Sequence, residues 1–334
     1  MKRKINIIAF FFITLFFKES FSESNSIVVL MYHRFNEHQH QSTSIDKEIF
    51  FEQMKFLKDE GFTILPLSDL ILFFNEKKTL PNKTIFITID DGYKSVYKHA
   101  YPILKEFNFP FSVFLSTDFV SNSENSDFMN WEMLKELKSN NGEIYNHTSD
   151  HSSLLKISKA KALKIINKSQ KILQKELGEV SLIFSYPYGE SNLDIENLIR
   201  EQGFKLAFSQ QSGPIHFYEN IFRLPRFSIN NKYGEIKRFK TIVKSKPMAP
   251  IQVLPLDTVF NNDKIRFEFQ TTFPKKSINC YVNNSAKIKK ISNQENFILE
   301  ILDLKKINYR VNCTFIDKNK NVFWFGKNFF YTRN

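Results

Sequence analysis

Short apolar segments alternate with longer amphipathic segments between residues 27 and 243. The short segments are rich in β-branched and aromatic residues, which is typical of strands. The longer ones carry apolar residues three and four positions apart, which is typical of helices packed on a sheet. The pattern predicts strands at 27–32, 62–65, 84–89, 111–115, 143–145, 182–185 and 205–208. It predicts helices at 47–59, 67–75, 96–107, 131–139, 159–177, 193–202 and 233–243.

Repeated β–α units in this order fold into a parallel sheet covered by helices, either open or closed into a barrel. In both arrangements functional side chains gather at the carboxyl ends of the strands. Asp90 and Asp91 follow one predicted strand, His147 follows another, and the turn 186–189 follows a third. The sequence therefore predicts a single site that draws on several strand ends.

The pattern changes beyond residue 244. Prolines predict a linker over 246–256, after an α/β domain over 23–245. The segments 258–260, 264–270, 277–282, 297–301, 309–316 and 322–330 then alternate with period two. This alternation predicts a small all-β, sandwich-like domain over 257–334. Whether that domain serves as a spacer or binds carbohydrate stays open.

Two cysteines are present, Cys280 and Cys313, and both lie in strand-like segments of the last quarter. In an oxidising compartment they can form a disulfide between two strands, whereas two buried free thiols fit the same pattern. Two cysteines without a CxxC pair argue against a cysteine metal site.

The first residues have the three-part layout of a secretory signal peptide. A basic segment at 2–4 precedes an uncharged apolar run over 5–17, and small residues stand at the cleavage positions in 20–22. The apolar run is short for a membrane span, although an uncleaved anchor is the alternative. We expect a signal peptide over 1–22 and a mature protein, beginning near residue 23, in the periplasm or outside the cell.

The formal net charge is +12, from 47 Lys and Arg against 35 Asp and Glu. A surplus of this kind can indicate binding to nucleic acid or to an anionic surface. The lysines are scattered, however, and no basic stripe interleaved with aromatic residues is present to follow phosphates and stack bases. We therefore expect no nucleic-acid partner.

The strongest candidates for chemistry are Asp90-Asp91-Gly92 and the pair His147 and His151. Successive side chains on a strand point in opposite directions, so one aspartate can bind a metal while its neighbour acts as a base. Two histidines and one carboxylate with open positions for water form a hydrolytic metal site. Taken alone, the first motif is an ordinary turn, and the second is a pair of exposed histidines in a loop.

Two further elements add to this set. The turn Tyr186-Pro187-Tyr188-Gly189 can aim a backbone N–H at a reacting carbonyl oxygen, as an oxyanion hole requires. His33, at the end of the first predicted strand, can act as a general acid because its ordinary pKa is near neutrality. Each of them, considered alone, is more often structural.

The order Asp-Asp-Gly, His-Thr-x-x-His and Pro-Tyr-Gly resembles the polysaccharide deacetylases of carbohydrate esterase family 4, the NodB-homology domain, over roughly 27–229. The resemblance implies an α/β fold built as a distorted (β/α) barrel. It implies Asp90 as the catalytic base, and a backbone N–H of Tyr188 that helps to hold the oxyanion. Asp91, His147 and His151 are the implied ligands of a divalent metal, usually zinc, with cobalt and nickel as alternatives.

The early Met-Tyr-His element resembles a circularly permuted subset, the poly-N-acetylglucosamine deacetylases of exopolysaccharide systems. This likeness implies His33 as the general acid, in preference to His216, whose surroundings match the late family motif poorly. Arg226 lies in a segment that resembles the end of such domains. We expect Tyr186, Pro187 and Arg226 to contact the substrate.

One position departs from the family pattern. Many members carry an arginine two residues before the motif proline, where it braces the base, and Ser185 occupies that position here. The departure puts the positioning of Asp90 in question.

Together these features predict a metal-dependent hydrolase that removes N-acetyl groups from an extracytoplasmic polysaccharide resembling poly-N-acetylglucosamine, with release of acetate. The implied partners are that polymer and the envelope or exopolysaccharide export machinery. One alternative is a deacylase for another polymer, such as peptidoglycan or acetylated xylan. Another is a non-catalytic glycan-binding protein on the same fold, which the serine at 185 mildly favours.

Overall fold

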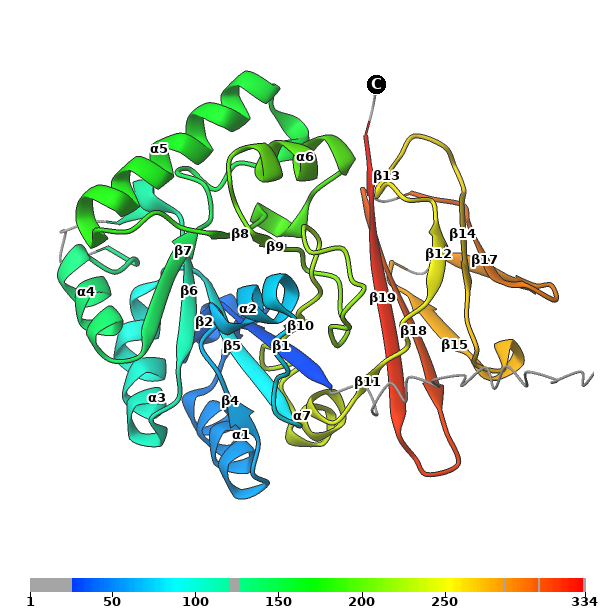
Figure 1. Cartoon of the computed structure of the whole chain (residues 1–334), viewed down its shortest axis with the longest axis horizontal. Helices are drawn as coiled ribbons and strands as arrows, with labels where there is room; N and C mark the ends of the chain where they lie inside the picture. Colours follow the sequence, from blue (N-terminus) through cyan, green and yellow to red (C-terminus); the bar gives the residue numbers. More distant parts are fainter. Residues whose placement is uncertain (1–25, 121–125, 285, 306, 333–334) are drawn as a thin grey trace, which may run out of the picture.

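The computed structural model describes residues 26–120, 126–284, 286–305 and 307–332. The expected signal peptide, residues 1–22, lies outside the described residues. The described chain forms an α/β unit and, beside it, a unit made of strands (Figure 1). Among the described residues, no helix combines the length and the apolar character needed to cross a membrane.

The α/β unit is built on a curled parallel sheet whose strand order is β10-β1-β5-β6-β7-β8-β9, with β4 beside β5. Its strands are β1 (Ile27–Tyr32), β4 (Thr63–Ile64), β5 (Thr84–Asp91), β6 (Phe111–Leu115), β7 (Gly142–Asn146), β8 (Ile183–Ser185), β9 (Leu206–Phe208) and β10 (Phe227–Ser228). Leu224 bridges Phe208 of β9, and three residues later Phe227 pairs with Leu30 of β1. The segment 224–228 thus joins the two sides of the sheet, which confirms the expected distorted barrel.

Helices cover the outside of this barrel (Figure 1). They are α1 (Lys47–Asp59), α3 (Tyr101–Phe107), α4 (Trp131–Ser139), α5 (Lys159–Leu177), α6 (Leu193–Glu201) and α7 (Ile236–Val243). A further helix, α2 (Asp69–Glu76), instead packs its buried Leu70 against the apolar cluster on the inner side of the sheet. In α5, the Ser158 side chain caps the first turn by accepting from the Lys161 amide, and Gly178 ends the helix in the left-handed conformation. The helix expected at 96–107 instead opens with a π-helical turn, Val96–Ala100. Pro102, which has no N–H to donate to the preceding turn, accounts for the interruption.

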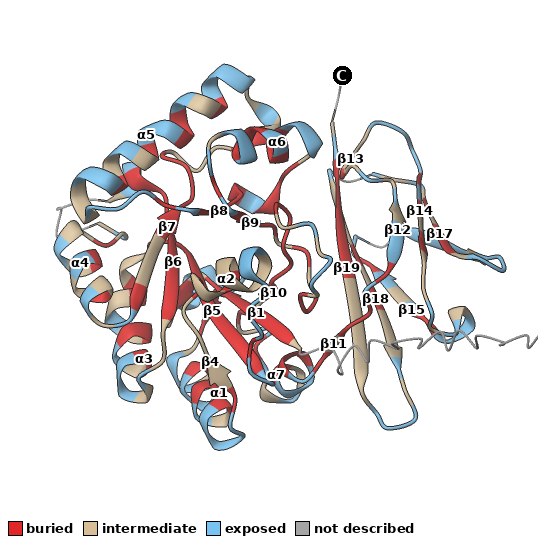
Figure 2. Cartoon of the chain, in the orientation of Figure 1, coloured by how far each residue is buried: buried red, intermediate tan, exposed pale blue. Residues whose placement is uncertain are grey.

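The strands explain where the core lies, because their side chains alternate between two apolar clusters. Val28 and Leu30 of β1 join the cluster beneath α1 and α7, whereas Val29 joins the second cluster with Phe86 and Phe114. The strands of the sheet are accordingly buried along most of their length (Figure 2). Since Asp90 and Phe86 are an even number of residues apart on β5, the Asp90 side chain points to the same side as Phe86.

The second unit, which we call the β-module, consists of two packed sheets. The first has the order β11-β19-β18-β15 with β13 beside β19, and the second has the order β12-β14-β17-β16. The strands are β11 (Lys246–Pro247), β12 (Ile251–Leu254), β13 (Val259–Phe260), β14 (Ile265–Gln270), β15 (Asn279–Val282), β16 (Lys287–Ser292), β17 (Asn296–Leu302), β18 (Asn308–Ile316) and β19 (Val322–Tyr331). Their inner faces form one apolar core, which agrees with the expected sandwich.

Two features of the β-module differ from expectation. The segment 246–256, expected to be a linker, contains β11 and β12, which pair with β19 and β14. The strand β16 was not expected, because its lysine-rich sequence is exposed on nearly every residue and shows no buried face. Charged side chains are typical of such sheet edges, where they discourage pairing with other chains.

Cys280 and Cys313 form a disulfide, with their Cα atoms 4.1 Å apart. They are direct partners across the antiparallel pair β15 and β18. Of the two possibilities that the sequence left open, the structure therefore has the bridge rather than two free thiols.

The β-module is docked closely on the barrel. A Cβ added to Gly326 of β19 would lie 2.1 Å from the Ser212 carbonyl oxygen, so the two backbones touch where a side chain cannot fit. The Trp324 ring stands edge-on to Phe227 of the barrel with centroids 5.1 Å apart. From the barrel, Arg223 Nη1 donates to the Leu256 carbonyl oxygen of the β-module at 3.0 Å. These contacts fix the position of the β-module on the barrel.

We predict that Gly326→Ala lowers the free energy of unfolding by about 1–3 kcal/mol, because the added methyl group forces the sheet away from Ser212. Urea denaturation followed by tryptophan fluorescence measures the change. Gly213→Ala is the matched control at the same contact, since a Cβ there would meet its nearest neighbour at 3.7 Å, an ordinary van der Waals distance. Equal losses in the two variants would contradict the prediction.

Candidate metal and catalytic site

Asp91, His147 and His151 come together as the sequence predicted. Asp91 ends β5, and the two histidines follow β7. The Nε2 atoms of His147 and His151 lie 3.4 and 3.1 Å from Asp91 Oδ1, and one ligand atom of each residue lies within 4.8 Å of the others. Asp91 Oδ1 is buried and accepts no hydrogen bond from the described residues.

This arrangement fits a divalent metal ion. A buried carboxylate oxygen without a hydrogen bond is costly unless another group compensates it. Here two imidazole nitrogens face the same oxygen, and one oxygen with two nitrogens is the donor set that suits zinc and similar ions.

The loop after β7 carries the two histidines in a strained conformation. Thr148 and His151 have φ values of 66° and 56°, in the left-handed region that side chains other than glycine rarely adopt. The Thr148 amide donates to Asn146 Oδ1 at 2.8 Å, and the His151 amide donates to Thr148 Oγ1 at 3.0 Å. These bonds hold the tight loop, so the two histidines converge without a helix.

His147 is oriented by the neighbouring strand. Its Nδ1 lies 2.7 Å from the Ser185 carbonyl oxygen. Because a carbonyl oxygen can only accept, Nδ1 carries the proton and Nε2 is left to face Asp91. This hydrogen bond to a backbone carbonyl is the usual way in which a metal-binding histidine is fixed in one tautomer.

Asp90 is fully buried and pairs with Arg226. The guanidinium donates from Nη1 to Oδ1 at 2.7 Å and from Nη2 to Oδ2 at 2.8 Å. Burial raises the pKa of Asp90. The positive charges of Arg226 and of the nearby histidines lower it by more, so the pKa of Asp90 is below its usual value. The carboxylate is therefore ionised and held in one orientation.

The same arginine explains why a serine can occupy position 185. Arg226 Nη2 donates to Ser185 Oγ at 2.8 Å, and Arg226 Nε donates to the Ser209 carbonyl at 3.2 Å. The cation that braces Asp90 thus comes from the segment 224–228 instead of from position 185. The departure from the family pattern leaves Asp90 fully supported.

His33 lies at the end of β1, close to both aspartates. Its Nε2 is 3.9 Å from Asp90 Oδ2, and its side chain is 15% exposed. Burial lowers the pKa of His33, although the carboxylates of Asp91 and Asp90 act in the opposite direction.

The turn after β8 places Tyr188 beside the histidines. Tyr188 has a φ of 61° within the short helix η5 (Pro187–Gly189), and its ring stands edge-on to His151 with centroids 4.6 Å apart. The ring is 53% exposed and borders the open side of the site.

The three expected substrate contacts need correction. Tyr186 and Arg226 are completely buried, and Pro187 is buried as well. The Tyr186 hydroxyl donates to the Phe222 carbonyl at 3.0 Å, and the Arg226 guanidinium forms an ion pair with Asp90. Their side chains point into the protein, so we assign them to positioning the site rather than to contact with a substrate.

The site opens into a cavity of about 920 Å³. It is lined by His33, Asp91, His151 and Tyr188, and by side chains that sequence reasoning missed: Tyr93, Phe119, Phe128, Gln210, Lys232, Tyr233 and Arg310.

The rings of Tyr93 and Phe128 stack with centroids 4.9 Å apart, and Arg34 lies over Tyr93. Burial and the charge of Asp91 raise the pKa of Tyr93 to about 12, so its hydroxyl keeps its proton. Tyr93 follows Asp-Asp-Gly directly, and this position in the sequence could have identified it as a lining residue. No feature of the sequence indicated that Arg310, on β18, would line the cavity.

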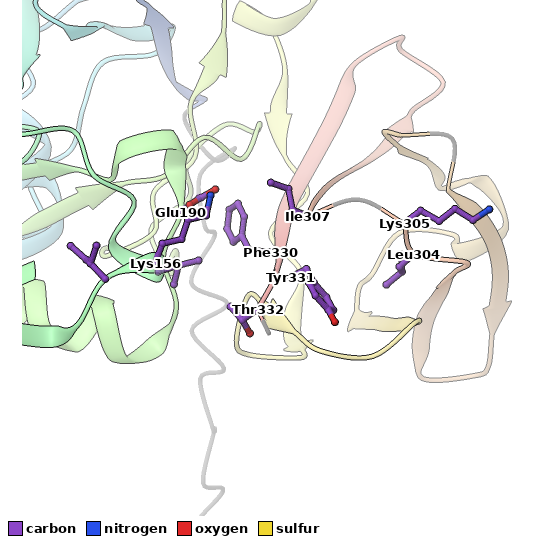
Figure 3. A pocket seen from close by; sticks show the side chains of 10 residues that line it. Lys156, Glu190, Leu304, Lys305, Ile307, Phe330, Tyr331 and Thr332 are labelled. Atoms are coloured by element: carbon purple, nitrogen blue, oxygen red, sulfur yellow. The ribbon is translucent and has the colours of Figure 1, made fainter. Parts of the chain in front are cut away.

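Another cavity, of about 720 Å³, lies between the barrel and the β-module (Figure 3). Its lining includes Lys156 and Glu190 on one side and Leu304, Lys305 and Phe330 on the other. It shares no lining residue with the cavity of Asp91. The group of side chains that could hold a metal ion, found among the described residues, therefore belongs to the first cavity.

A parallel α/β barrel with one carboxylate and two histidines at its strand ends, next to a second ionised carboxylate, defines a metal-dependent hydrolase. The family model for polysaccharide deacetylase matches residues 77–207. A poly-beta-1,6-N-acetyl-D-glucosamine N-deacetylase of Staphylococcus aureus is 32% identical over 209 residues, which are 59% of this chain and 72% of that protein. The chain belongs to the polysaccharide deacetylase family.

Other comparisons agree on family and fold. A putative polysaccharide deacetylase of Bacillus subtilis, YxkH, is 25% identical over 202 residues, or 60% of this chain and 71% of that protein. The structure of IcaB from Ammonifex degensii superposes with a TM-score of 0.60 at 23% identity, covering 67% of this chain and 99% of that one. The Streptococcus pyogenes deacetylase PplD, solved in complex with acetate, gives 0.59 at 21% identity, covering 65% and 99%. These two structures share the barrel fold.

We predict that Arg226→Gln lowers the free energy of unfolding by about 3–5 kcal/mol, because it leaves the Asp90 carboxylate buried without a partner. The double variant Asp90→Asn/Arg226→Gln should regain a large part of that loss, since it removes both charges. Chemical denaturation of the wild type, both single variants and the double variant closes the cycle. Additive losses would show that the pair does not act as a unit.

Proposed function

We propose that this protein removes N-acetyl groups from a polysaccharide resembling poly-N-acetylglucosamine outside the cytoplasm, releasing acetate and leaving free amines. The observation that carries this proposal is the buried Asp91 oxygen, which faces two imidazole nitrogens next to the ionised Asp90. The activity named for the Staphylococcus aureus relative supports the choice of polymer.

In this proposal Asp91, His147 and His151 hold a divalent ion, which we propose to be zinc. When bound, such an ion supplies Lewis-acid chemistry, polarising a carbonyl group and lowering the pKa of a water molecule.

The protein's own groups handle the protons. Asp90 takes a proton from the attacking water: its lowered pKa keeps the carboxylate ionised and able to accept, and Arg226 fixes its orientation. As the C–N bond of the acetamide breaks, His33 gives a proton to the departing amine. Burial makes protonated His33 a stronger acid than a free histidine, which suits donation to an amine. The backbone N–H of Tyr188 contributes to holding the negative charge on the carbonyl oxygen.

The proposed location outside the cytoplasm has two supports. The disulfide between Cys280 and Cys313 is typical of proteins in oxidising compartments. The sequence pattern of residues 1–22 is that of a signal peptide. Interaction with envelope or exopolysaccharide export machinery stays a prediction from the resemblance.

We predict that Asp91→Ala and His151→Ala abolish both zinc binding and acetate release from β-1,6-linked N-acetylglucosamine oligomers, because each removes one donor of the set. Elemental analysis of the purified proteins measures the metal, and an enzyme-coupled assay measures acetate. His216→Ala is the matched control, since His216 pairs with Glu219 at 3.0 Å and does not line the cavity of Asp91.

The same assay separates the alternatives. Acetate release from peptidoglycan or acetylated xylan, with none from the glucosamine oligomers, would redirect the proposal to another polymer. Oligomer binding without acetate release, in protein loaded with zinc or cobalt, would indicate a glycan-binding protein. Full activity in Asp91→Ala would refute the metal site.

We predict that His33→Gln lowers kcat by about 100-fold or more while zinc content stays unchanged, because a general acid contributes roughly 10²–10⁴-fold without binding the metal. Steady-state kinetics and elemental analysis on the same preparation test both parts. A variant that loses its zinc would assign His33 to the metal site, and one with normal kcat would exclude it as the acid.

A further inference from the structure

A second hollow, on the β-module, adjoins the cavity of Asp91. This hollow has a volume of about 450 Å³ and shares three lining residues with the cavity: Ser228, Tyr233 and Arg310. Ser228 and Tyr233 belong to the barrel, whereas Arg310 belongs to β18. The two hollows therefore adjoin at these residues, and together they reach from the candidate site onto the face of the β15 and β18 sheet that is turned away from the core of the β-module; we call them the groove.

The alternation of β18 produces the floor of this groove. Tyr309, Val311 and Cys313 are buried in the core of the β-module. Arg310, Asn312 and Thr314, between and after them, are turned to the other face and line the hollow. On the neighbouring strand, Tyr281 pairs with Asn312 and Asn279 pairs with Thr314. The outer face thus combines amide and hydroxyl groups with a tyrosine that is 69% exposed.

Contacts with the barrel keep this face in place. Arg310 Nη2 donates to Gln210 Oε1 of the barrel at 3.3 Å. Asn312 Oδ1 accepts from Trp324 Nε1 at 3.1 Å, and the Trp324 ring packs on Phe227. The groove is therefore formed by packed elements of both units.

The charge of the groove selects its occupant. Among the described lining residues of the two hollows, Asp91 is the single carboxylate, whereas Lys232, Arg238 and Arg310 are cations. An N-acetylated sugar unit is neutral and offers hydroxyl and amide groups to the asparagines. A deacetylated unit carries an ammonium group, which these cations repel.

We propose that the β-module is the outer half of the substrate groove: the N-acetylated glycan continues from Asp91 past Tyr233 and Arg310 and stacks one sugar ring on Tyr281. The proposal rests on the proposed function and gives the β-module a specific role in it. The superposition on IcaB uses 67% of this chain and covers 99% of that structure. The remaining third of this chain therefore has no counterpart in IcaB. The outer half of the groove is thus additional to what that structure contains.

Kinetics with a short and a long substrate test the proposal. Tyr281→Ala should raise KM for a β-1,6-linked N-acetylglucosamine hexasaccharide roughly three- to tenfold more than KM for the disaccharide, because the longer chain alone reaches the tyrosine. Tyr218→Ala is the matched control: this tyrosine is 74% exposed and lines neither hollow. Equal effects of Tyr281→Ala on both lengths, or none, would overturn the proposal.

A second variant tests the selection by charge. The fully deacetylated hexasaccharide should inhibit the wild type weakly, and Arg310→Gln should lower its inhibition constant about threefold or more at low salt, with the difference shrinking at high salt. Unchanged inhibition would refute the role of the cations.

Binding measurements separate this proposal from the proposed function. If the wild type releases no acetate, the proposed function fails. Calorimetry with the acetylated hexasaccharide then still tests whether the glycan binds in the groove. Tighter binding by the wild type than by Tyr281→Ala supports it, and equal or absent binding overturns it.

Discussion

The buried ion pair between Arg226 and Asp90 is the interaction on which both the barrel and its site depend. A fully buried carboxylate is costly unless a cation of matching shape and further hydrogen bonds satisfy it, and Arg226 does so with both terminal nitrogens. The arginine belongs to the segment 224–228, which pairs with β9 on one side and β1 on the other. One side chain therefore links the closure of the sheet to the ionisation of Asp90.

Around this pair, the site stores backbone strain. Asp91, Thr148, His151 and Tyr188 all have positive φ values, although none is a glycine. Such conformations persist only where surrounding bonds compensate their cost. The hydrogen bonds from the Thr148 and His151 amides, together with the bond from His147 to Ser185, provide that compensation. The strain is concentrated in the three motifs whose side chains must converge on one point.

The β-module contributes to the surface of the site in the same way, through contacts between segments that are far apart in the sequence. Its position is set by backbone contact at Gly326 and by the packing of Trp324 on Phe227, so Arg310 is carried on a packed strand into the cavity of Asp91. A loop could supply the same side chain, but with less precise placement. The opening of the candidate site is thus lined in part by a unit that is distant from it along the chain.

The sequence by itself determined the elements and the candidate ligands, because both depend on local spacing. The helix at 47–59 and the strand at 27–32 were predicted with their observed ends, and Asp91, His147 and His151 were found from their spacing and their places after strands. The partner of Asp90 was decided only in the tertiary structure, since Arg226 lies 136 positions away and reaches it through closure of the sheet. The same holds for Arg310, for the burial of Tyr186, and for the strands β11 and β12, whose identity depends on pairing with distant segments. Local periodicity reports which face of a segment is buried, but which segments meet is settled by packing across the whole chain.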